Sequence, residues 1–355
     1  MTYRVVQWAT GNLGRAAIEG IVAHPELELA GVWVRSADKV GMDAGTLAGI
    51  APLNVAASGS IDEIIALKPD CVLYSPLMAD DAEVVTLLEA GIHVVTPLNW
   101  FYPGNIAIPH LRAACEKGNA VLHGTGIHPG GMTEKIPVML SAFSQNITYV
   151  SSEEFSDCRT YGAPDVLSEL MLFGKTLEQA RASMMPAFMA GGFNQSIDMI
   201  ADALGFKLDE EKFAEHEIFA ATAPIDSPIG KIQPGCLAAQ RFNFEGRVRG
   251  EPVISASVNW YMGTEDIEEG FSIGDGGERY ELVIKGDPPV TMQLHGIHPD
   301  ASLSLEEIQK RNPGIVATAN HCVSSIPYVC QAQPGVRHYL DLPMVAGRAR
   351  GDLAE

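Results

Sequence analysis

The first twenty residues constrain the fold of this chain more than any other stretch. The apolar run from Val5 to Trp8 gives way at once to the letters ATGNLG at 9–14 and then to helix-forming residues. A glycine-containing loop between a buried strand and a helix is the pattern of a β-α-β unit whose loop holds a dinucleotide. The sequence therefore predicts that the chain opens with a nucleotide-binding sheet.

Short β-rich runs alternate with helical runs through about the first 130 residues. Such alternation is typical of a parallel sheet with crossover helices. The expected strands are residues 3–8, 28–34, 71–74, 93–96 and 120–123, and the expected helices are residues 15–23, 61–67, 82–90 and 106–117. We therefore expect an α/β fold that begins with a Rossmann domain built on a doubly wound parallel sheet.

The alternation ends after residue 131. A strand candidate at 148–155 is followed by helix-like stretches to about residue 205. Polar and apolar residues then alternate at 238–249, 252–262, 279–285 and 290–295. This pattern predicts a second, α+β domain on an open, largely antiparallel sheet with one covered face. We place the first domain at residues 1–131 and the second at residues 132–305.

The loop at 9–14 is expected to bind a pyrophosphate through its backbone N–H groups and the start of the following helix. Gly11 allows the close approach of the phosphates, and Gly14 allows the helix to pack on the strand. Ala9 stands where the fingerprint has its first glycine, a tolerable change if Ala9 keeps φ below zero. The predicted cofactor-binding residues of this loop are Thr10, Gly11, Asn12, Leu13 and Gly14.

The end of the second strand predicts which dinucleotide is bound. An NAD site usually has Asp or Glu about 20 residues beyond the glycine loop, for the ribose hydroxyls. This chain has Arg35 and Ser36 there, with Lys39 close behind. These residues suit a 2′-phosphate through charge-assisted hydrogen bonds, so NADP(H) is preferred and NAD(H) is possible. The alternative is a solvated basic turn, in which Asp38 reduces the local positive charge.

Later loops at the same edge of the sheet are expected to surround the nicotinamide ring. Ser75 and Thr96 are candidates to bind the cofactor ribose or carboxamide, and Gly126 lets the backbone approach the ring. Ordinary capping of strand ends is the alternative for the two hydroxyls.

Hydride transfer to a carbonyl or imine must be matched by a proton. His128 is the first candidate donor, because imidazole titrates near neutrality. Asn99 and Tyr102 follow as donors that polarise a carbonyl oxygen. The alternative for His128 is that it satisfies a turn before Pro-Gly-Gly. No metal site is expected, because the six cysteines form no group at zinc spacing, and reduced, mostly buried thiols are predicted.

Composition narrows the classes of protein to which this chain can belong. The chain has 355 residues, 46% of them hydrophobic and 19% charged, and no apolar stretch reaches the roughly 20 residues of a membrane helix. A net charge of -20 argues against nucleic acid, since phosphate binding needs clustered Lys and Arg. The N-terminus has no secretory signal, so we expect a soluble, cytoplasmic protein that acts on a small molecule.

Four stretches carry a resemblance to a known family. They are WATGNLGRAAI, SADKVGMDAG, GTGIHPGG at 124–131 and ATANHCVSSIPYVCQAQPGVRHYLDLP near the end. The chain resembles the dihydrodipicolinate reductase-like superfamily, close to 2,4-diaminopentanoate dehydrogenase and the native amine dehydrogenases. That resemblance implies a nicotinamide domain, an open α+β catalytic domain, a C-terminal segment at 306–355 that returns to the first domain, and a homodimer.

The sequence departs from these relatives in two loops. The resemblance implies a glutamate after the strand at 93–96 in the active amine dehydrogenases, and this chain has Pro97, Leu98 and Asn99. The paired-histidine motif of true dihydrodipicolinate reductase is also absent, because residues 153–161 are EEFSDCRTY.

The predicted function is the NADP(H)-preferring reduction of a C=O or C=N bond in a small, mainly apolar substrate. Added ammonium is expected to change the rate little unless Glu153 or Glu154 supplies the missing base. Glu154, Asp157 and Tyr161 are candidates to line the substrate side, and the alternative is that they are solvated polar positions. The alternatives are an ammonium-dependent amine dehydrogenase and, in another class, a non-catalytic dinucleotide-binding sensor.

Overall fold

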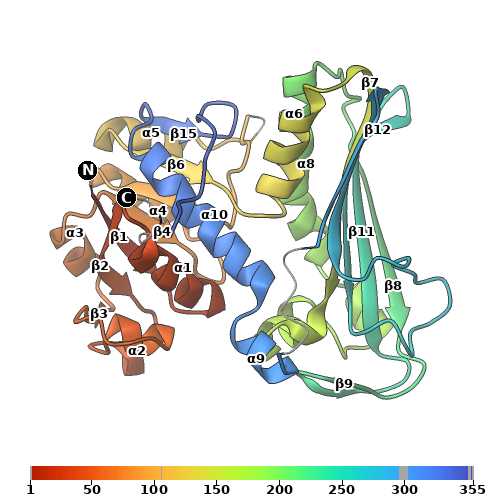
Figure 1. Ribbon diagram of the computed structural model, residues 1–355, viewed down its shortest axis with the longest axis horizontal. Coiled ribbons are helices and arrows are strands. Elements are labelled where there is room, and N and C mark those ends of the chain that lie inside the picture. Colours follow the sequence, from red (N-terminus) through yellow and green to blue (C-terminus); the bar gives the residue numbers. More distant parts are fainter. Residues whose placement is uncertain (1, 105, 296–302, 351–352, 354–355) are drawn as a thin grey trace. The chain divides into compact units, whose positions relative to one another are not determined.

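The computed structural model of the protein describes residues 2–104, 106–295, 303–350 and residue 353. The chain divides into two compact units, each with its own sheet and core (Figure 1). Unit 1 comprises Met1–Gly131 and Ile315–Glu355, and unit 2 comprises Met132–Gly314. Within the described ranges, no helix combines the length and the apolar character needed to cross a membrane.

Unit 1 is built on a parallel sheet with the strand order β15-β6-β5-β4-β1-β2-β3 in the described residues. The prediction of a doubly wound Rossmann sheet is confirmed. Its strands are β1 (Tyr3–Trp8), β2 (Leu27–Trp33), β3 (Ala57–Ser58), β4 (Cys71–Tyr74), β5 (His93–Thr96), β6 (Val121–Gly124) and β15 (Gly335–Arg337). Its helices are α1 (Asn12–Ala23), α2 (Ala44–Ala48), α3 (Ile61–Ala66), α4 (Asp81–Glu89), α5 (Pro109–Gly118) and α10 (Pro313–Val329), with a 3₁₀ turn η1 (Ala37–Lys39).

Both faces of this sheet are buried, because successive side chains along each strand point to opposite faces. Val5 of β1 packs in one apolar cluster with α1 and with Val323 of α10. Its neighbour Val6 packs in the opposite cluster with Leu87 of α4 and Leu111 of α5. This double burial explains why most positions of the central strands are apolar.

The sequence located the long elements of unit 1 and missed the short ones. The strands at 3–8, 71–74 and 93–96 are confirmed, whereas α1 begins at Asn12, three residues before the expected start. The early start follows from Gly11, whose extended backbone forms the N-cap. Strands β3 and β15 were not predicted, because two or three residues show no periodicity.

Unit 2 carries a mixed sheet with the strand order β14-β13-β7-β12-β11-β8 in the described residues. Its neighbours are antiparallel except β7 and β12, so the prediction of a largely antiparallel sheet is confirmed with one parallel pair. The strands are β7 (Gln145–Asp157), β8 (Phe213–Ala220), β11 (Leu237–Val248), β12 (Glu251–Tyr261), β13 (Arg279–Asp287) and β14 (Val290–Leu294), beside a hairpin of β9 (Ile225–Ser227) and β10 (Gly230–Ile232). The helices are α6 (Ile136–Ser141), α7 (Leu177–Arg181), α8 (Met185–Leu204) and α9 (Leu305–Lys310), with the short turns η2 (Gly131–Lys135), η3 (Cys158–Thr160) and η4 (Val166–Leu170).

Helix α8 covers one face of this sheet, as Figure 1 shows. Phe193 of α8 stacks on Phe244 of β11 with ring centroids 5.1 Å apart. The opposite face is polar, and Asn259 there accepts from Arg241 at 2.7 Å and donates to Glu153 at 2.9 Å. One covered face and one polar face produce the alternation by which the sequence predicted these strands. All six cysteines of the chain are free thiols, four of them buried, as predicted.

Glu134 is a buried acid at the start of unit 2. Its side chain is fully buried, and the Ser196 hydroxyl of α8 donates to Oε1 at 2.6 Å. The second carboxyl oxygen, Oε2, has no hydrogen-bond partner among the described residues. Burial raises the pKa of Glu134 to about 8, and the bond from Ser196 opposes part of that shift. The carboxyl is therefore protonated at neutral pH.

This burial predicts a pH-dependent stability. The native state holds the Glu134 proton more tightly than the unfolded chain, so this stabilisation is complete below about pH 4.5 and is lost as the pH rises to about 8. Glu134→Gln keeps the shape of the side chain and cannot ionise. Urea unfolding should therefore give the variant a free energy of unfolding a few kcal/mol above that of wild type near pH 9, and an equal value near pH 5. An equal stability difference at both pH values would contradict this assignment.

Candidate functional site

Gln7 joins two loops at the carboxyl end of the unit 1 sheet. Its side chain is fully buried within strand β1. Its Nε2 atom donates to the Ala9 carbonyl at 2.9 Å and to the Ser75 hydroxyl oxygen at 2.8 Å. The loop after β1 is thereby fixed to the loop after β4. The sequence signal for this role is a glutamine inside the apolar run from Val5 to Trp8, because a buried polar side chain needs hydrogen-bond partners.

The glycine loop itself has one feature that the sequence did not predict. Ala9 has φ +75°, so the condition under which alanine would cost little at this position, a φ below zero, is not met. The Ala9 carbonyl accepts from Gln7 and also lies against helix α1, since a Cβ added at Gly14 would stand 2.2 Å from that oxygen. The close approach of the helix to the Ala9 carbonyl requires glycine at position 14, in a loop where Ala9 itself has a left-handed backbone.

The N-terminus of α1 is open for an anion. Gly11 is its N-cap and provides no side-chain hydrogen bond, and the first turn holds no acidic residue. A Cβ added at Gly11 would have no atom within 4 Å, so the backbone is exposed there. Unsatisfied helix N–H groups and the helix dipole both favour a phosphate at such a terminus. The structure brings the predicted residues into this one loop and helix start, namely Thr10, Gly11, Asn12, Leu13 and Gly14.

The basic residues after β2 lie beside this loop. Lys39 Nζ donates to the Thr10 hydroxyl oxygen at 3.3 Å, so one cation reaches the glycine loop directly. The Arg35 side chain is 72% exposed, lies 5.8 Å from the Trp33 ring and is 3.6 Å from a carboxylate oxygen of Glu83. Ser36 is the N-cap of η1, and its hydroxyl makes no capping bond. This arrangement leaves Arg35 and Ser36 at the surface where the sequence predicted a 2′-phosphate.

Ser75 and Thr96 both support their own loops. Ser75 Oγ accepts from Gln7 and donates to the Trp8 carbonyl at 3.2 Å. Thr96 is fully buried, and its hydroxyl accepts from the Leu98 N–H at 3.3 Å. These bonds shape the loops after β4 and β5. Their contact with a cofactor stays a prediction.

The loops after β5 and β6 pack closely on each other. A Cβ added at Gly124 would stand 2.2 Å from the Asn99 carbonyl oxygen. The loop after β6 then folds tightly, since Gly126 has φ +156° and a Cβ at Gly130 would stand 2.4 Å from the Gly126 carbonyl oxygen. His128 lies half-buried in this turn and precedes a cis proline. The structure therefore groups Asn99, Gly126 and His128 at one edge of the sheet.

The C-terminal segment contributes residues that the sequence analysis did not single out. Tyr339 Oη bonds His321 Nε2 at 2.7 Å, and the same hydroxyl bonds the Thr125 hydroxyl in a short contact. His338 lies against Tyr102, with ring centroids 4.6 Å apart. A chain of hydrogen bonds therefore runs from α10 through Tyr339 to the loop after β6. These residues fall in the stretch that carried the family resemblance.

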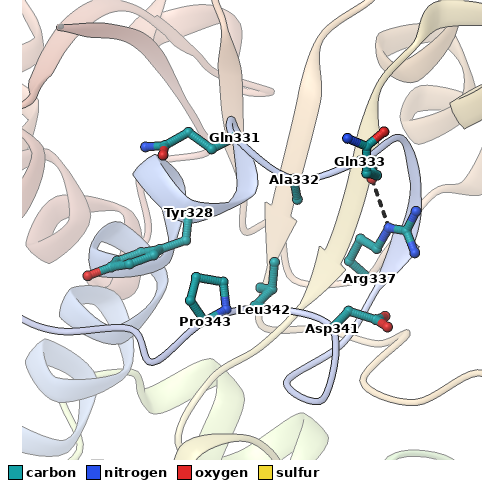
Figure 2. Close-up of a pocket in the computed structure, with 8 residues that line it drawn as sticks. All are labelled: Tyr328, Gln331, Ala332, Gln333, Arg337, Asp341, Leu342 and Pro343. Atoms are coloured by element: carbon teal, nitrogen blue, oxygen red, sulfur yellow. Dashed lines mark hydrogen bonds between the residues drawn. The ribbon is translucent and has the colours of Figure 1, made fainter.

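The C-terminal segment also lines a pocket of about 400 Å³ in unit 1. Figure 2 shows Tyr328, Arg337 and Leu342 around it, with Arg337 Nε donating to the Gln333 carbonyl at 2.8 Å. None of the residues that the sequence predicted for cofactor or catalysis lines this pocket. It is therefore separate from the glycine loop.

The acidic residues of unit 2 that the sequence offered as candidate bases or substrate contacts lie in different surroundings. Asp157 pairs with Arg159 at 2.5 Å, and Glu153 belongs to the polar face, where it accepts from Asn259. Glu154 is half-buried on the other face, and burial raises its pKa to about 7. Burial also raises the pKa of the Cys158 thiol well above its usual value, which disfavours a cysteine nucleophile.

The chain is similar in sequence to known dehydrogenases. The model of the 2,4-diaminopentanoate dehydrogenase C-terminal domain matches residues 132–353. The chain belongs to the 2,4-diaminopentanoate dehydrogenase family. An amine dehydrogenase of Streptomyces virginiae is 30% identical to this family member over 96% of both chains.

Two further relatives extend the comparison. The 2,4-diaminopentanoate dehydrogenase of Acetoanaerobium sticklandii is 28% identical, over 66% of this chain and 60% of its own length. The solved amine dehydrogenase of Mycobacterium smegmatis shares the fold, with a TM-score of 0.77 over 98% of both chains at 20% identity. The resemblance read from the sequence is confirmed, and so is the prediction of an NAD(P)-dependent oxidoreductase.

Three substitutions in the glycine loop separate its roles. Gly14→Ala should lower both the melting temperature and the affinity for NADPH, because its Cβ meets the Ala9 carbonyl. Gly11→Ala should lower the affinity alone, since its Cβ enters open space, and the sequence predicts that the pyrophosphate binds there. Ala9→Gly should keep both and add up to about 1 kcal/mol of stability. Calorimetric titration measures the affinity, and thermal unfolding measures the stability. Full NADPH affinity in folded Gly14→Ala would refute the prediction that the loop at residues 9–14 binds the dinucleotide.

Proposed function

We propose that this protein is an NADP(H)-preferring oxidoreductase that reduces the C=N bond of a small, mainly apolar substrate. The similarity to an amine dehydrogenase over nearly the whole chain carries this proposal. Removing a hydride from an amine carbon produces a C=N bond, and the reverse reaction reduces it. The large family match in unit 2 extends the similarity beyond the nucleotide-binding unit.

The cofactor site fits a dinucleotide phosphate. The open N-terminus of α1 at Gly11 suits the pyrophosphate. Lys39 beside Thr10 and the exposed Arg35 supply two cations for a 2′-phosphate, where an NAD-binding domain usually presents an acid. Glu83 beside Arg35 weakens this field, so NAD(H) binds as well but less tightly.

A bound reduced nicotinamide supplies the hydride, and the residues of the chain have to orient the substrate and manage protons. Gly126 lets the loop after β6 approach the ring, while Asn99, Tyr102 and His128 are the donors for the reacting heteroatom. The Tyr339 bonds to Thr125 and His321 hold that loop in place. We further propose a homodimer in the cytoplasm.

Direct reduction of a carbonyl group is the second candidate. The loop after β5 offers Asn99 and Tyr102 and has no acid at residues 97–99. Neutral donors stabilise the developing alkoxide of a ketone without needing a base. The same assay therefore includes ketones.

The test follows NADPH oxidation by purified protein with a panel of preformed cyclic imines and matched cyclic ketones. Wild type should reduce the imines faster than the ketones, and faster with NADPH than with NADH. Arg35→Asp should weaken NADPH binding by about 10-fold or more and change NADH binding little, because one charged partner of the phosphate is lost.

Arg4→Asp is the matched control, since this exposed residue lies at the opposite end of strand β1. It should leave the ratio of the two cofactor affinities unchanged. Equal affinities for NADPH and NADH in wild type would reject the phosphate site. No turnover of any imine or ketone would reject the proposed reaction and favour a dinucleotide-binding sensor.

A further inference from the structure

Unit 2 contains a pocket of about 510 Å³ that is lined by its own residues alone. The pocket is formed by the ends of β7 and β12, by the turn η3 and by the segment between β12 and β13. Asp157 and Tyr261 are the last residues of the two strands and are register partners. Because side chains alternate along a strand, both lie on the polar face that carries Glu153 and Asn259. The pocket therefore belongs to the face of the sheet opposite α8.

Tyr261 presents a hydroxyl group to this pocket. The residue is only 2% exposed, and its hydroxyl makes no hydrogen bond with any other residue that the structure describes. The hydroxyl oxygen is not one of the fully enclosed polar atoms without a partner, so it borders the cavity. A buried hydroxyl group costs free energy unless it is hydrogen-bonded. A molecule in the pocket would supply the partner that the chain does not.

The charged residues that line the pocket give it a net negative charge. They are Asp157, Arg159 and Glu278. Arg159 is held by Asp157, since its Nε lies 3.0 Å from both carboxylate oxygens, and these two charges offset each other. Glu278 adds a second carboxylate, whose Oε1 accepts from the Asp157 N–H at 2.8 Å. Burial, and then the charges of the two acids, raise the pKa of Tyr261 above its usual value, so its hydroxyl stays protonated.

Arg279 lies next to the pocket and is bound to other groups. Its Nε donates to Glu281 at 2.6 Å, and its Nη2 donates to the Ile273 carbonyl at 2.8 Å. Its guanidinium carbon also lies 3.9 Å from the centre of the Phe155 ring. Both arginines at the pocket are thus paired with acids, which disfavours an anionic ligand.

One wall of the pocket is apolar. Phe271 and Ile273 pack with Tyr261 in a small cluster, and the ring centroids of Phe271 and Tyr261 are 5.7 Å apart. Aromatic faces attract cations and also pack against alkyl groups. A metal ion is not favoured, because the described residues contain no group of three His, Cys, Asp or Glu side chains that could hold one. The lining suits an organic cation that has N–H donors and a short apolar chain.

We infer that this pocket binds a small primary ammonium ion, whose N–H groups donate to Glu278 and to the Tyr261 hydroxyl oxygen while its alkyl chain lies against Phe271. The inference goes beyond the proposed function. It concerns unit 2 alone and involves neither the dinucleotide nor the loops of unit 1.

Calorimetric titration of the full-length protein without cofactor tests this inference. The probe is n-butylammonium chloride, and n-butanol and sodium n-butyrate at equal ionic strength are the matched neutral and anionic probes. Wild type should bind the ammonium ion at least about 10-fold more tightly than either of them. Glu278→Gln should weaken that binding by about 10-fold or more, because it removes the charged acceptor. Tyr261→Phe should weaken it by about 3-fold or more, because it removes a neutral acceptor and keeps the ring.

Asp226→Asn is the matched control. It also removes an acidic charge from unit 2, but Asp226 is exposed and pairs with Lys231 in the β9–β10 hairpin, so binding should be retained. Equal affinity for the three probes, or no binding by folded wild type, overturns the inference. Unchanged ammonium affinity in Tyr261→Phe overturns it even if Glu278→Gln folds poorly. Since none of these readings uses NADPH or turnover, the proposed function stands or falls separately.

Discussion

The approach of helix α1 to the Ala9 carbonyl is the constraint on which the nucleotide-binding unit depends. Gly14 stands so close to that oxygen that a single methyl group would collide with it. Gln7 donates to the same carbonyl from inside strand β1, so the loop is fixed from both sides. With the loop held there, the N-terminus of α1 at Gly11 has no side-chain cap, and such a helix terminus suits an anion.

Other loops at the same edge of the sheet are also fixed by contacts with residues distant in the sequence. Gln7 reaches Ser75, Gly124 packs against Asn99, and Tyr339 bonds Thr125. Each of these contacts joins residues far apart in the sequence. The side chains that could touch a ligand are therefore placed by buried neighbours that do not, and substitution of such a neighbour should disturb the site as strongly as substitution of a site residue.

The parts of this protein that follow from local sequence pattern were predictable. The strand at Tyr3–Trp8 and the loop after it were predictable, because apolar periodicity and glycine spacing lie within a few residues. The left-handed Ala9 was not, since its conformation depends on Gln7 and Gly14 together. Glu153 and Glu154 are neighbours in sequence and lie on opposite faces, and only the register of β7 separates them. Local sequence pattern predicts the helices and strands, whereas tertiary contacts decide which polar residues come together at one site.

The glycine loop of unit 1 and the similarity to an amine dehydrogenase over nearly the whole chain both favour hydride transfer to the carbon of a C=N bond. Mass spectrometry of the product tests this most directly, with a cyclic imine as substrate and NADPH deuterated at its transferable position. The account predicts a cyclic amine that carries one deuterium on the carbon bonded to nitrogen. Unreacted imine, or deuterium found only on the carbinol carbon of an alcohol formed from the corresponding ketone, would contradict it.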